Sequence, residues 1–530
     1  MSPSPSITRA KDISKPALSR AQHINDPDRT QHIKWSLGSW PNDSLDSILP
    51  SRRRVAIPRL DSFYKPLIGA TLLATFLRVT ITLIEGYRLP GVGSDAFNYY
   101  WQGFLNVSNH PYIDPGSFLF HGKSIPDASY PPLTAFLESV ADLCRLQTFF
   151  EHQILWCLIG SSTVSVIGII ARDIGGNRAG IFAAFTAAIY PGLWINDPLV
   201  LSETPTQLLV AIAILISFRY LRRPRGPLAF GIGVVIGLAS LTRADRPLLW
   251  PLLVIPTILT AKISHLRSIE RKRRSRIGML AIAITGFMIV ISPWAVRNLL
   301  TFRNPEIIST TLGRTLIGAN CTTTYYGPLI GSWVYACLTV PPTGDPSQHD
   351  AFHRHQAVSY ALHHKSRWPA VLYARLGRTW GFYSPSNNLL VDAYDNGRGI
   401  WPSAAGLIAY WILAPSAIFG ALMLRKRRIP TFPLMAPFIS VTVVSIFIYG
   451  NTRFRAIAEP SIVILASLAE AGWRISKGRK QEALLNGRDL GFASKISKFC
   501  RWIADVPSDN QFEGGDSVES QYGKLEKNAG

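Results

Sequence analysis

The chain has 530 residues, of which 47% are hydrophobic and 17% are charged, and its formal net charge is +22 at pH 7. The apolar residues gather in long uninterrupted stretches, so the composition favours one polytopic membrane protein over several soluble domains. Much of the positive charge lies between these stretches and needs no nucleic-acid partner to explain it. The 5 cysteines are too few for a disulfide-dense scaffold.

Residues 1–60 are polar and rich in Ser, Pro and charge, which is typical of a disordered cytoplasmic tail without a signal peptide. Ten apolar stretches follow, most of them about as long as a helix must be to cross a hydrocarbon layer of roughly 30 Å. We therefore predict an all-α polytopic membrane protein with about ten transmembrane helices, and ten to thirteen fit the sequence. The ten are Pro66–Ile84, Ile154–Ile170, Ala179–Ile195, Thr206–Tyr220, Leu228–Leu241, Leu248–Ile263, Ile277–Val296, Trp401–Leu424, Pro430–Tyr449 and Ile457–Trp473.

Basic clusters alternate with these stretches. Cytoplasmic loops retain Lys and Arg, and the clusters fall on every second junction. We therefore expect the protein in a plasma or inner membrane, with both termini on the cytoplasmic side. The clusters are Arg52–Arg54, Arg172 with Arg178, Arg222–Arg225, Arg267–Arg276, Arg425–Arg428 and Arg474–Lys480. This topology divides the chain after the first tail into four parts. A catalytic membrane module at 61–300, with an outer loop at 86–153, is followed by an extracytoplasmic domain at 301–400 and C-terminal helices at 401–473. The last part is a cytoplasmic tail at 474–530 with an amphipathic helix at 492–506.

The first outer loop opens with GSDAFNYY, in which Asp95 begins an aromatic, amphipathic segment at 95–105. Ser94 or Asp95 is suited to cap that helix, so capping and chemistry are both open roles for Asp95. A second amphipathic helix is expected at 132–144, after the rigid SYPP turn at 129–132.

The second outer loop contains Cys321 and Cys337, which oxidation outside the cytoplasm would allow to form a disulfide. It also contains His353, His355, His363 and His364. Their spacing gives no i, i+4 pair backed by a carboxylate, so we interpret them as a solvated helix face and predict no metal site.

Arginines also occur at outer junctions, where the topology rule disfavours them. Ionisable groups at that depth usually pair with each other or with an anionic ligand. A structural interpretation pairs them with Asp197, Asp245 or Glu459. In a functional interpretation the arginines bind an anionic ligand, because Asp95, Asp197 and Glu203 are expected on the same side of the membrane as these arginines. The arginines lie in RADR at 243–246, at Arg297 and Arg303, and in NTRFR at 451–455.

Several motifs, by their order along the chain and the side of the membrane on which they are expected, make the sequence resemble the C-type glycosyltransferase superfamily. The resemblance is to its polyprenyl-phosphate-sugar-dependent branch, which includes protein O-mannosyltransferases and lipid A aminoarabinose transferases. The resemblance covers roughly residues 64–300. The motifs are GSDAFNYY at 93–100, SYPPL at 129–133, ARDIGGNRAG at 171–180, IYPGLWINDPLVLSE at 189–203, GVVIGLASLTRADRPLLWP at 233–251 and PWAVRN at 293–298.

The resemblance implies that Asp95 is the catalytic base and that either Asp197 or Glu203 is a second site acid. Ala96 follows Asp95 where the family often has a second acid, so a divalent metal is not indicated and no cofactor is required. The resemblance implies a donor phosphate bound by Arg243 or Arg246, with Arg453, Arg455 and Lys123 as further candidates. Tyr99, Tyr100 and Tyr130 are the candidates for an aromatic platform that holds the acceptor.

The expected function is an inverting transfer of a hexose or pentose, as in mannosyltransferases, on the extracytoplasmic side. The donor would be a polyprenyl-phosphate sugar among membrane lipids, and the acceptor a hydroxyl of a protein, polysaccharide or lipid. One alternative is a transporter or flippase of lipid-linked saccharides, although the repeated halves typical of transporters are not evident. Another is an oligosaccharide ligase or polymerase, which would depend on Arg375 and Arg378 in the second loop.

Overall fold

The structure is a computed structural model, and it describes residues 62–85, 90–91, 94–261, 269–394 and 397–470. All of these belong to one compact unit, Leu60–Gly530. The described residues form helices and no strand apart from one isolated bridge between Ile113 and Pro126, which confirms the all-α class. The predicted tails at 1–60 and 474–530, with the amphipathic helix at 492–506, lie outside the described residues.

Five of the described helices are long and apolar enough to cross a membrane. A sixth span is obtained if α6 (Asn177–Ile189) and the segment from α7 (Pro191–Trp194) to Leu199 are taken together, with a bend of 69°. The bend falls at Pro191, whose ring removes an N–H that a continuous helix would use. The five are α1 (Tyr64–Glu85), α5 (Phe149–Gly175), α8 (Glu203–Arg222), α11 (Ile269–Thr301) and α17 (Ile400–Lys426).

All ten predicted stretches contain apolar helix, but ten membrane crossings are not confirmed. Three of the stretches give apolar segments of only 10–17 residues. These are α9 (Gly226–Thr242), the segment from η3 (Arg246–Leu248) through η4 (Trp250–Val254) to α10 (Ile255–Thr260), and α18 (Phe432–Phe447). The tenth stretch is helical over its described part, residues 459–470.

Small residues let the helices approach closely, as is common between helices in lipid. A Cβ added to Gly233 of α9 would collide with the backbone of Ala283 in α11, and one added to Gly286 of α11 would collide with Phe230. Gly233 and Gly237 of α9 therefore serve its packing against α11. Around α5, the helices α1, α6 and α8 contribute buried side chains to one apolar core.

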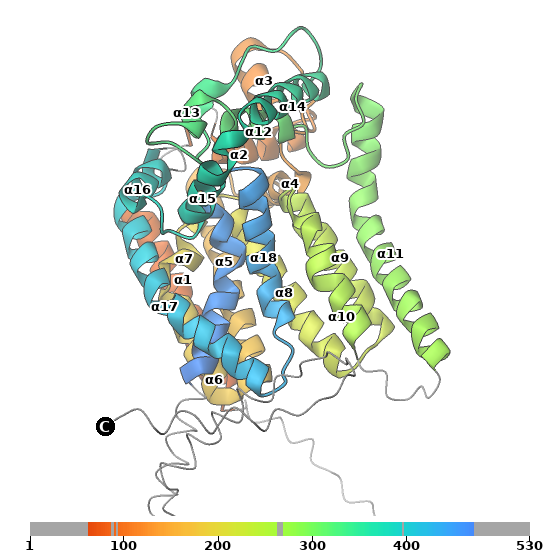
Figure 1. Ribbon diagram of the computed structural model, residues 1–530, viewed down its shortest axis with the longest axis vertical. Helices are drawn as coiled ribbons and strands as arrows, with labels where there is room; N and C mark the ends of the chain where they lie inside the picture. Colours follow the sequence, from red (N-terminus) through yellow and green to blue (C-terminus); the bar gives the residue numbers. More distant parts are fainter. Residues whose placement is uncertain (1–61, 86–89, 92–93, 262–268, 395–396, 471–530) are drawn as a thin grey trace, which may run out of the picture. The chain divides into compact units, whose positions relative to one another are not determined.

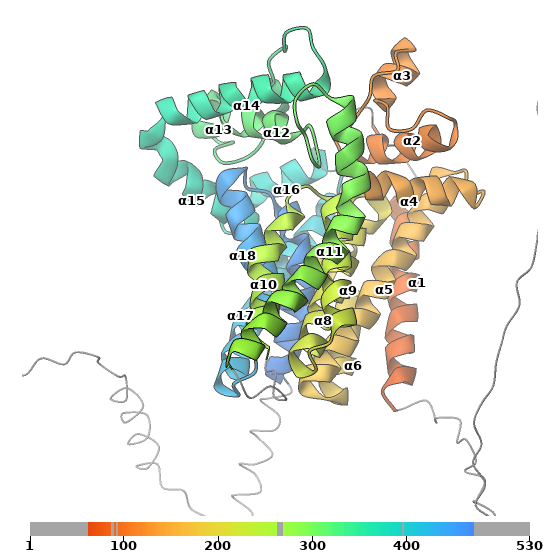
Figure 2. The same cartoon turned by 90° about the vertical axis from the view of Figure 1, so that its right-hand side faces the viewer.

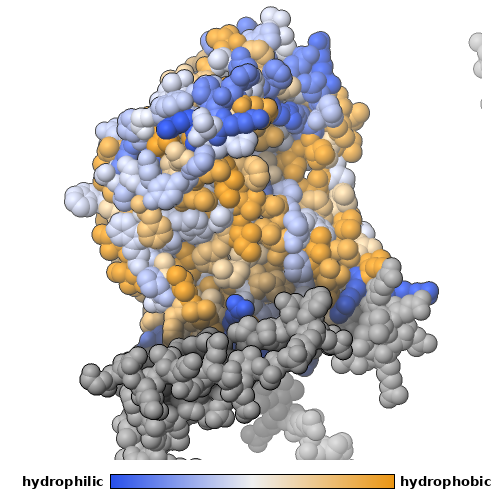
Figure 3. All heavy atoms as spheres, viewed as in Figure 1, coloured by the Kyte–Doolittle hydropathy of each residue, from blue (hydrophilic) through white to orange (hydrophobic). Residues whose placement is uncertain are grey.

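The two large loops lie at the same end of the bundle, which we call the loop end (Figures 1 and 2). The turn between α17 and α18 lies at the opposite end (Figure 2). Hydrophobic residues cover much of the helices' visible face, and hydrophilic ones gather over the loop end (Figure 3). The loop helices are α2 (Asp95–Val107), α3 (Pro115–His121), α4 (Pro132–Leu143), α12 (Leu312–Ala319), α13 (Thr322–Tyr325), α14 (Pro346–His363), α15 (Trp368–Thr379) and α16 (Pro385–Tyr394).

Buried arginines hold the second loop together, and Arg375 also fastens it to Ile446 of α18 in the bundle. Arg375 donates to the backbone carbonyls of Ile446 and Ala319, and Arg378 donates to those of Ile330 and Pro328. A disulfide joins Cys321 to Cys337, as the sequence predicts.

The first loop is fastened in a similar way. Arg297 of α11 donates to the backbone carbonyls of Asp127 and Tyr112. This arginine of an outer junction therefore fixes the backbone of the first loop. Three of the four histidines named above also contact backbone carbonyls: His353, His363 and His364. In the described part of the chain, no group of three or more His, Cys, Asp or Glu side chains is placed to hold a metal ion.

Candidate functional site

Asp95 is the first residue of α2, but it does not cap the helix. The cap is Ser94, whose hydroxyl accepts from the backbone N–H of Phe97. The Asp95 carboxylate instead accepts a hydrogen bond from the Tyr130 hydroxyl at 2.8 Å and pairs with Nη2 of Arg453 at 2.8 Å. Its side chain is 32% exposed, so the carboxylate is held on two sides and is still reachable from solvent.

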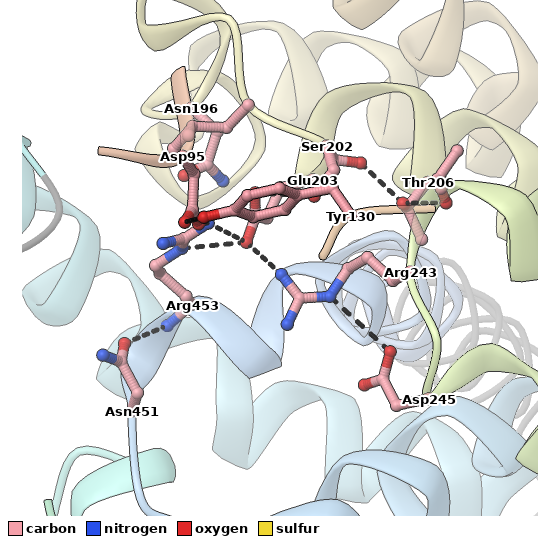
Figure 4. A network of polar contacts seen from close by, with 12 residues as sticks. Asp95, Tyr130, Asn196, Ser202, Glu203, Thr206, Arg243, Asp245, Asn451 and Arg453 are labelled. Carbon is pink, nitrogen blue, oxygen red and sulfur yellow. Dashed lines mark hydrogen bonds and ion pairs between the residues drawn. The ribbon is translucent and has the colours of Figure 1, made fainter. Parts of the chain in front are cut away.

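Arg453 brings the C-terminal part of the chain to this acid. It lies in η7 (Thr452–Ile457), which Asn451 caps by accepting from the Arg453 backbone N–H at 2.8 Å. The guanidinium group also contacts Oε1 of Glu203, with Nε and Nη2 each 2.9 Å away. One arginine therefore touches two carboxylates from distant parts of the sequence (Figure 4).

Glu203 and Arg243 meet because α8 begins where the neighbouring helix α9 ends. Glu203 lies in the first turn of α8 and Arg243 at the C-cap of α9, the two helix ends that favour an anion and a cation respectively. Nη1 of Arg243 donates to Oε1 of Glu203 at 2.6 Å, so this buried carboxylate oxygen receives two guanidinium groups (Figure 4).

Two further residues extend this group of charges. Asp245 lies 3.6 Å from Nε of Arg243 and 2.9 Å from Nη2 of Arg246. Arg246 is only 2% exposed, and its Nε and Nη1 find no hydrogen-bond acceptor among the described residues. We call the six residues the acid–arginine cluster: Asp95, Glu203, Asp245, Arg243, Arg246 and Arg453.

The electrostatics keep Arg453 charged and Tyr130 protonated. Burial lowers the pKa of Arg453, but the carboxylates of Glu203 and Asp95 outweigh it and hold that pKa well above its usual value. Burial and the nearby Asp95 carboxylate raise the pKa of Tyr130 well above its usual value. Tyr130 is therefore a stable hydrogen-bond donor to Asp95, and Arg453 is a permanent cation.

Of the two acids between which the sequence left the choice open, only Glu203 joins the cluster. Asp197 is fully buried and pairs with Nε of Arg78 at 2.7 Å, and it accepts from the Thr204 hydroxyl at 2.6 Å. It also packs so tightly against α5 that a Cβ at Gly160 would collide with its carboxylate. The structure therefore places Asp197 in a separate ion pair between the helices.

Two of the candidate phosphate ligands lie outside the cluster. Arg455 pairs with Glu459 at 2.5 Å and stacks 3.9 Å from the centre of the Tyr410 ring. This is the structural pairing that the sequence offered as an alternative. Lys123 lies in an exposed turn after α3.

The three candidate tyrosines separate in the same way. The rings of Tyr99 and Tyr130 meet edge to face at 5.1 Å beside Asp95. The Tyr100 hydroxyl donates to the carbonyl of Gln147, and its ring packs on Phe149, away from Asp95. Of the three, only Tyr99 and Tyr130 lie beside Asp95, and of these two Tyr99 is only 3% exposed.

Sequence reasoning missed two partners. Arg78 lies within the first apolar stretch, where a buried cation requires an acid, and Asp197 is that acid. Asp245 had been considered only as a neutraliser of one arginine, whereas it lies between Arg243 and Arg246.

No family model matches the chain, and no curated protein matches it. Among solved structures, the chain is similar to the oligosaccharyltransferase of Archaeoglobus fulgidus in the apo form, with 14% identity and a TM-score of 0.46 over 84% of this chain and 54% of that one. The chain thus spans about half the length of that protein. It is also similar to ArnT from Cupriavidus metallidurans bound to undecaprenyl phosphate, with 14% identity and a TM-score of 0.35 over 78% of each chain.

Proposed function

We propose that the chain is an integral membrane glycosyltransferase that moves a sugar from a polyprenyl-phosphate donor to an acceptor hydroxyl on the extracytoplasmic side. One observation carries this proposal: a carboxylate that solvent reaches, Asp95, lies 2.8 Å from a guanidinium group of a buried arginine cluster. Sugar transfer from a lipid phosphate requires this combination, because one group must take a proton from the acceptor while another holds the anionic leaving group.

Asp95 is the proposed general base. Its carboxylate takes the proton of the acceptor hydroxyl as the acceptor oxygen forms a bond to the anomeric carbon from one face. The bond from that carbon to the phosphate oxygen breaks on the opposite face, and its electron pair leaves with the polyprenyl phosphate. The anomeric configuration is therefore inverted. Proton transfer of this kind contributes about 10²–10⁴ in rate.

Arg243, Arg246 and Arg453 are the proposed ligands of the donor phosphate. A guanidinium group presents a planar fork that can grip two phosphate oxygens at once. Arg246 suits this role best, because it is buried and still has two N–H groups without an acceptor in the described part of the chain. Charge that develops on the leaving phosphate would be stabilised where water is largely excluded.

The other members of the site position these groups. Glu203 is buried and accepts from both Arg243 and Arg453, so it is a poor candidate for a base and a good anchor for the two guanidinium groups. Tyr130 orients the Asp95 carboxylate through its hydroxyl. The partly exposed ring of Tyr130 offers an apolar face beside Asp95 on which an acceptor could lie, and the buried ring of Tyr99 supports it edge to face.

A ligase or polymerase centred on Arg375 and Arg378 is less well supported. Both guanidinium groups are buried, and they donate to backbone carbonyls of the second loop and, through Arg375, to that of Ile446 in α18. These contacts give the two arginines a structural role. Asp95 is partly exposed and Arg246 has N–H groups without an acceptor among the described residues, so their contacts leave room for a ligand.

The test is to offer membranes that contain the protein a panel of labelled polyprenyl-phosphate sugars and to follow release of polyprenyl phosphate. We expect release from at least one donor with wild type and none above background with Asp95→Asn. Asp114→Asn is the matched control, because Asp114 caps α3 and asparagine preserves a cap. Release by Asp95→Asn at the wild-type rate would show that Asp95 is not the base.

A further inference from the structure

Arg453 is shared between the proposed base and the proposed phosphate site. Its Nη2 lies 2.8 Å from Oδ2 of Asp95 and 2.9 Å from Oε1 of Glu203, while its Nε also contacts Glu203 at 2.9 Å. The contact to Glu203 is the better anchored of the two, because Glu203 is 1% exposed and its Oε1 also accepts from Arg243. Asp95, at 32% exposed, is the partner that can be given up.

The charges of the acid–arginine cluster balance without any ligand. Asp95, Glu203 and Asp245 supply three carboxylates, and Arg243, Arg246 and Arg453 supply three guanidinium groups. The tyrosines whose electrostatics involve Asp95 are Tyr99, Tyr130 and Tyr449, and burial raises the pKa of each, so they add no charge. An anion that binds Arg243 or Arg453 must therefore compete with the carboxylates for the same cations.

We propose that Arg453 couples donor binding to the availability of the base. The donor phosphate draws the Nη2 end of Arg453 away from Asp95, while Nε stays on Glu203, which acts as the pivot. Oδ2 of Asp95 is thereby released to accept the proton of the acceptor hydroxyl. This inference rests on the proposed function and adds a regulation of the same site.

The coupling gives the reaction an order. Before the donor is bound, the base is occupied by a cation and by the Tyr130 hydroxyl, so an acceptor gains little from Asp95. After the donor is bound, one carboxylate oxygen is free beside the anomeric carbon. Because coupling between two sites is reciprocal, removing the charge of Asp95 must in turn strengthen binding of the phosphate.

The test measures binding of a fluorescent polyprenyl phosphate to the full chain in nanodiscs. We expect Asp95→Asn to bind it more tightly than wild type by about fivefold or more, which is the low end of typical coupling between sites. Asp114→Asn removes the same charge from the first loop outside the cluster, and we expect its affinity to stay within about twofold of wild type, as for weak surface electrostatics. Tyr130→Phe removes the neutral hydrogen bond to Asp95 and should also leave the affinity nearly unchanged.

Equal or weaker binding by Asp95→Asn would overturn the coupling. That result combined with loss of transfer in the same variant would leave the proposed function standing, so the two claims fail separately. If wild type neither binds polyprenyl phosphate nor releases it from any donor, both claims fail.

The pivot role of Glu203 has its own readout. Glu203→Gln frees Arg243 and Arg453 to bind the phosphate but lets Arg453 drift from its place between the two sites. We expect the KM for the donor and kcat to fall together. A fall in kcat with an unchanged or raised KM would assign Glu203 a purely structural role and overturn the pivot.

Discussion

Two contacts between an aspartate and an arginine contrast sharply in this molecule. Asp197 and Arg78 are both completely buried, and Thr204 completes the coordination of the acid. Asp95 and Arg453 are 32% and 12% exposed, and Arg453 is shared with a second carboxylate. The residue types are the same, but the first pair is closed to any other molecule and the second is open. Burial and sharing of partners separate a structural ion pair from a site that can exchange partners.

The open contact should be essential for activity and dispensable for folding. Asp95→Asn is expected to lower transfer by about 10²–10⁴, the usual contribution of a positioned base. Its unfolding temperature in detergent should match that of wild type, because Ser94 rather than Asp95 caps α2. A variant that unfolds early and keeps its activity per folded molecule would reverse the assignment.

The closed contact should show the opposite behaviour. Asp197→Asn leaves Arg78 buried without a counter-charge, and breaking a buried pair in this way typically costs about 3–5 kcal/mol of stability. The folded fraction should transfer sugar at nearly the normal rate. Replacing both partners, with Arg78→Met added to Asp197→Asn, should recover much of the loss. Thermal unfolding of the three proteins in detergent measures this, and unchanged stability of Asp197→Asn would contradict the distinction.

Arg246 sharpens the comparison, because it is buried like Arg78 but has N–H groups without an acceptor among the described residues. If those groups serve the donor phosphate, Arg246→Ala loses hydrogen bonds to a charged ligand, which are worth roughly 1.5–3 kcal/mol. We expect kcat/KM for the donor to fall by about one to two orders of magnitude. Arg455→Ala is the comparison variant, since Arg455 pairs with Glu459. A larger loss of kcat/KM in Arg455→Ala would place the phosphate there instead.

The smallest expected effect concerns Tyr130. Tyr130→Phe removes one neutral donor to Asp95, and a hydrogen bond of that kind contributes about 0.5–1.5 kcal/mol. Transfer should fall by about tenfold or less, with no change in unfolding temperature. Steady-state kinetics with saturating donor measures the effect, and complete inactivity would mean that Tyr130 has a chemical role of its own.

The sequence predicted the helical class, allowed the Cys321–Cys337 disulfide, and included Asp95 and Arg453 among its candidate site residues without predicting that they meet. Positive charges and apolar stretches placed Asp95, Glu203, Arg243 and Arg453 on one side, and α8 and α9 bring the middle two together. Which helices are long enough to cross a membrane depends on where prolines and caps end them, and stretch length alone did not reveal this.

Two choices between residues that are close in sequence could be made only from the backbone conformation. Asp197 and Glu203 are separated by Val200, whose positive φ of 53° turns the chain, so the two acids face different helices. Arg453 and Arg455 lie two residues apart in a 3₁₀ helix, which has three residues per turn, so their side chains point about 120° apart. Composition and charge cannot distinguish such neighbours, because the difference comes from local backbone geometry.

The claim on which this account depends is that the open contact faces away from the cytoplasm. In a chain whose free cysteines are replaced by serine, Asp95→Cys can be labelled in intact cells with a membrane-impermeant maleimide. Arg427→Cys, at the opposite end of the bundle after α17, is the control for the inner side. The account predicts that position 95 is labelled from outside and position 427 only after permeabilisation. Labelling of position 95 only after permeabilisation would contradict it.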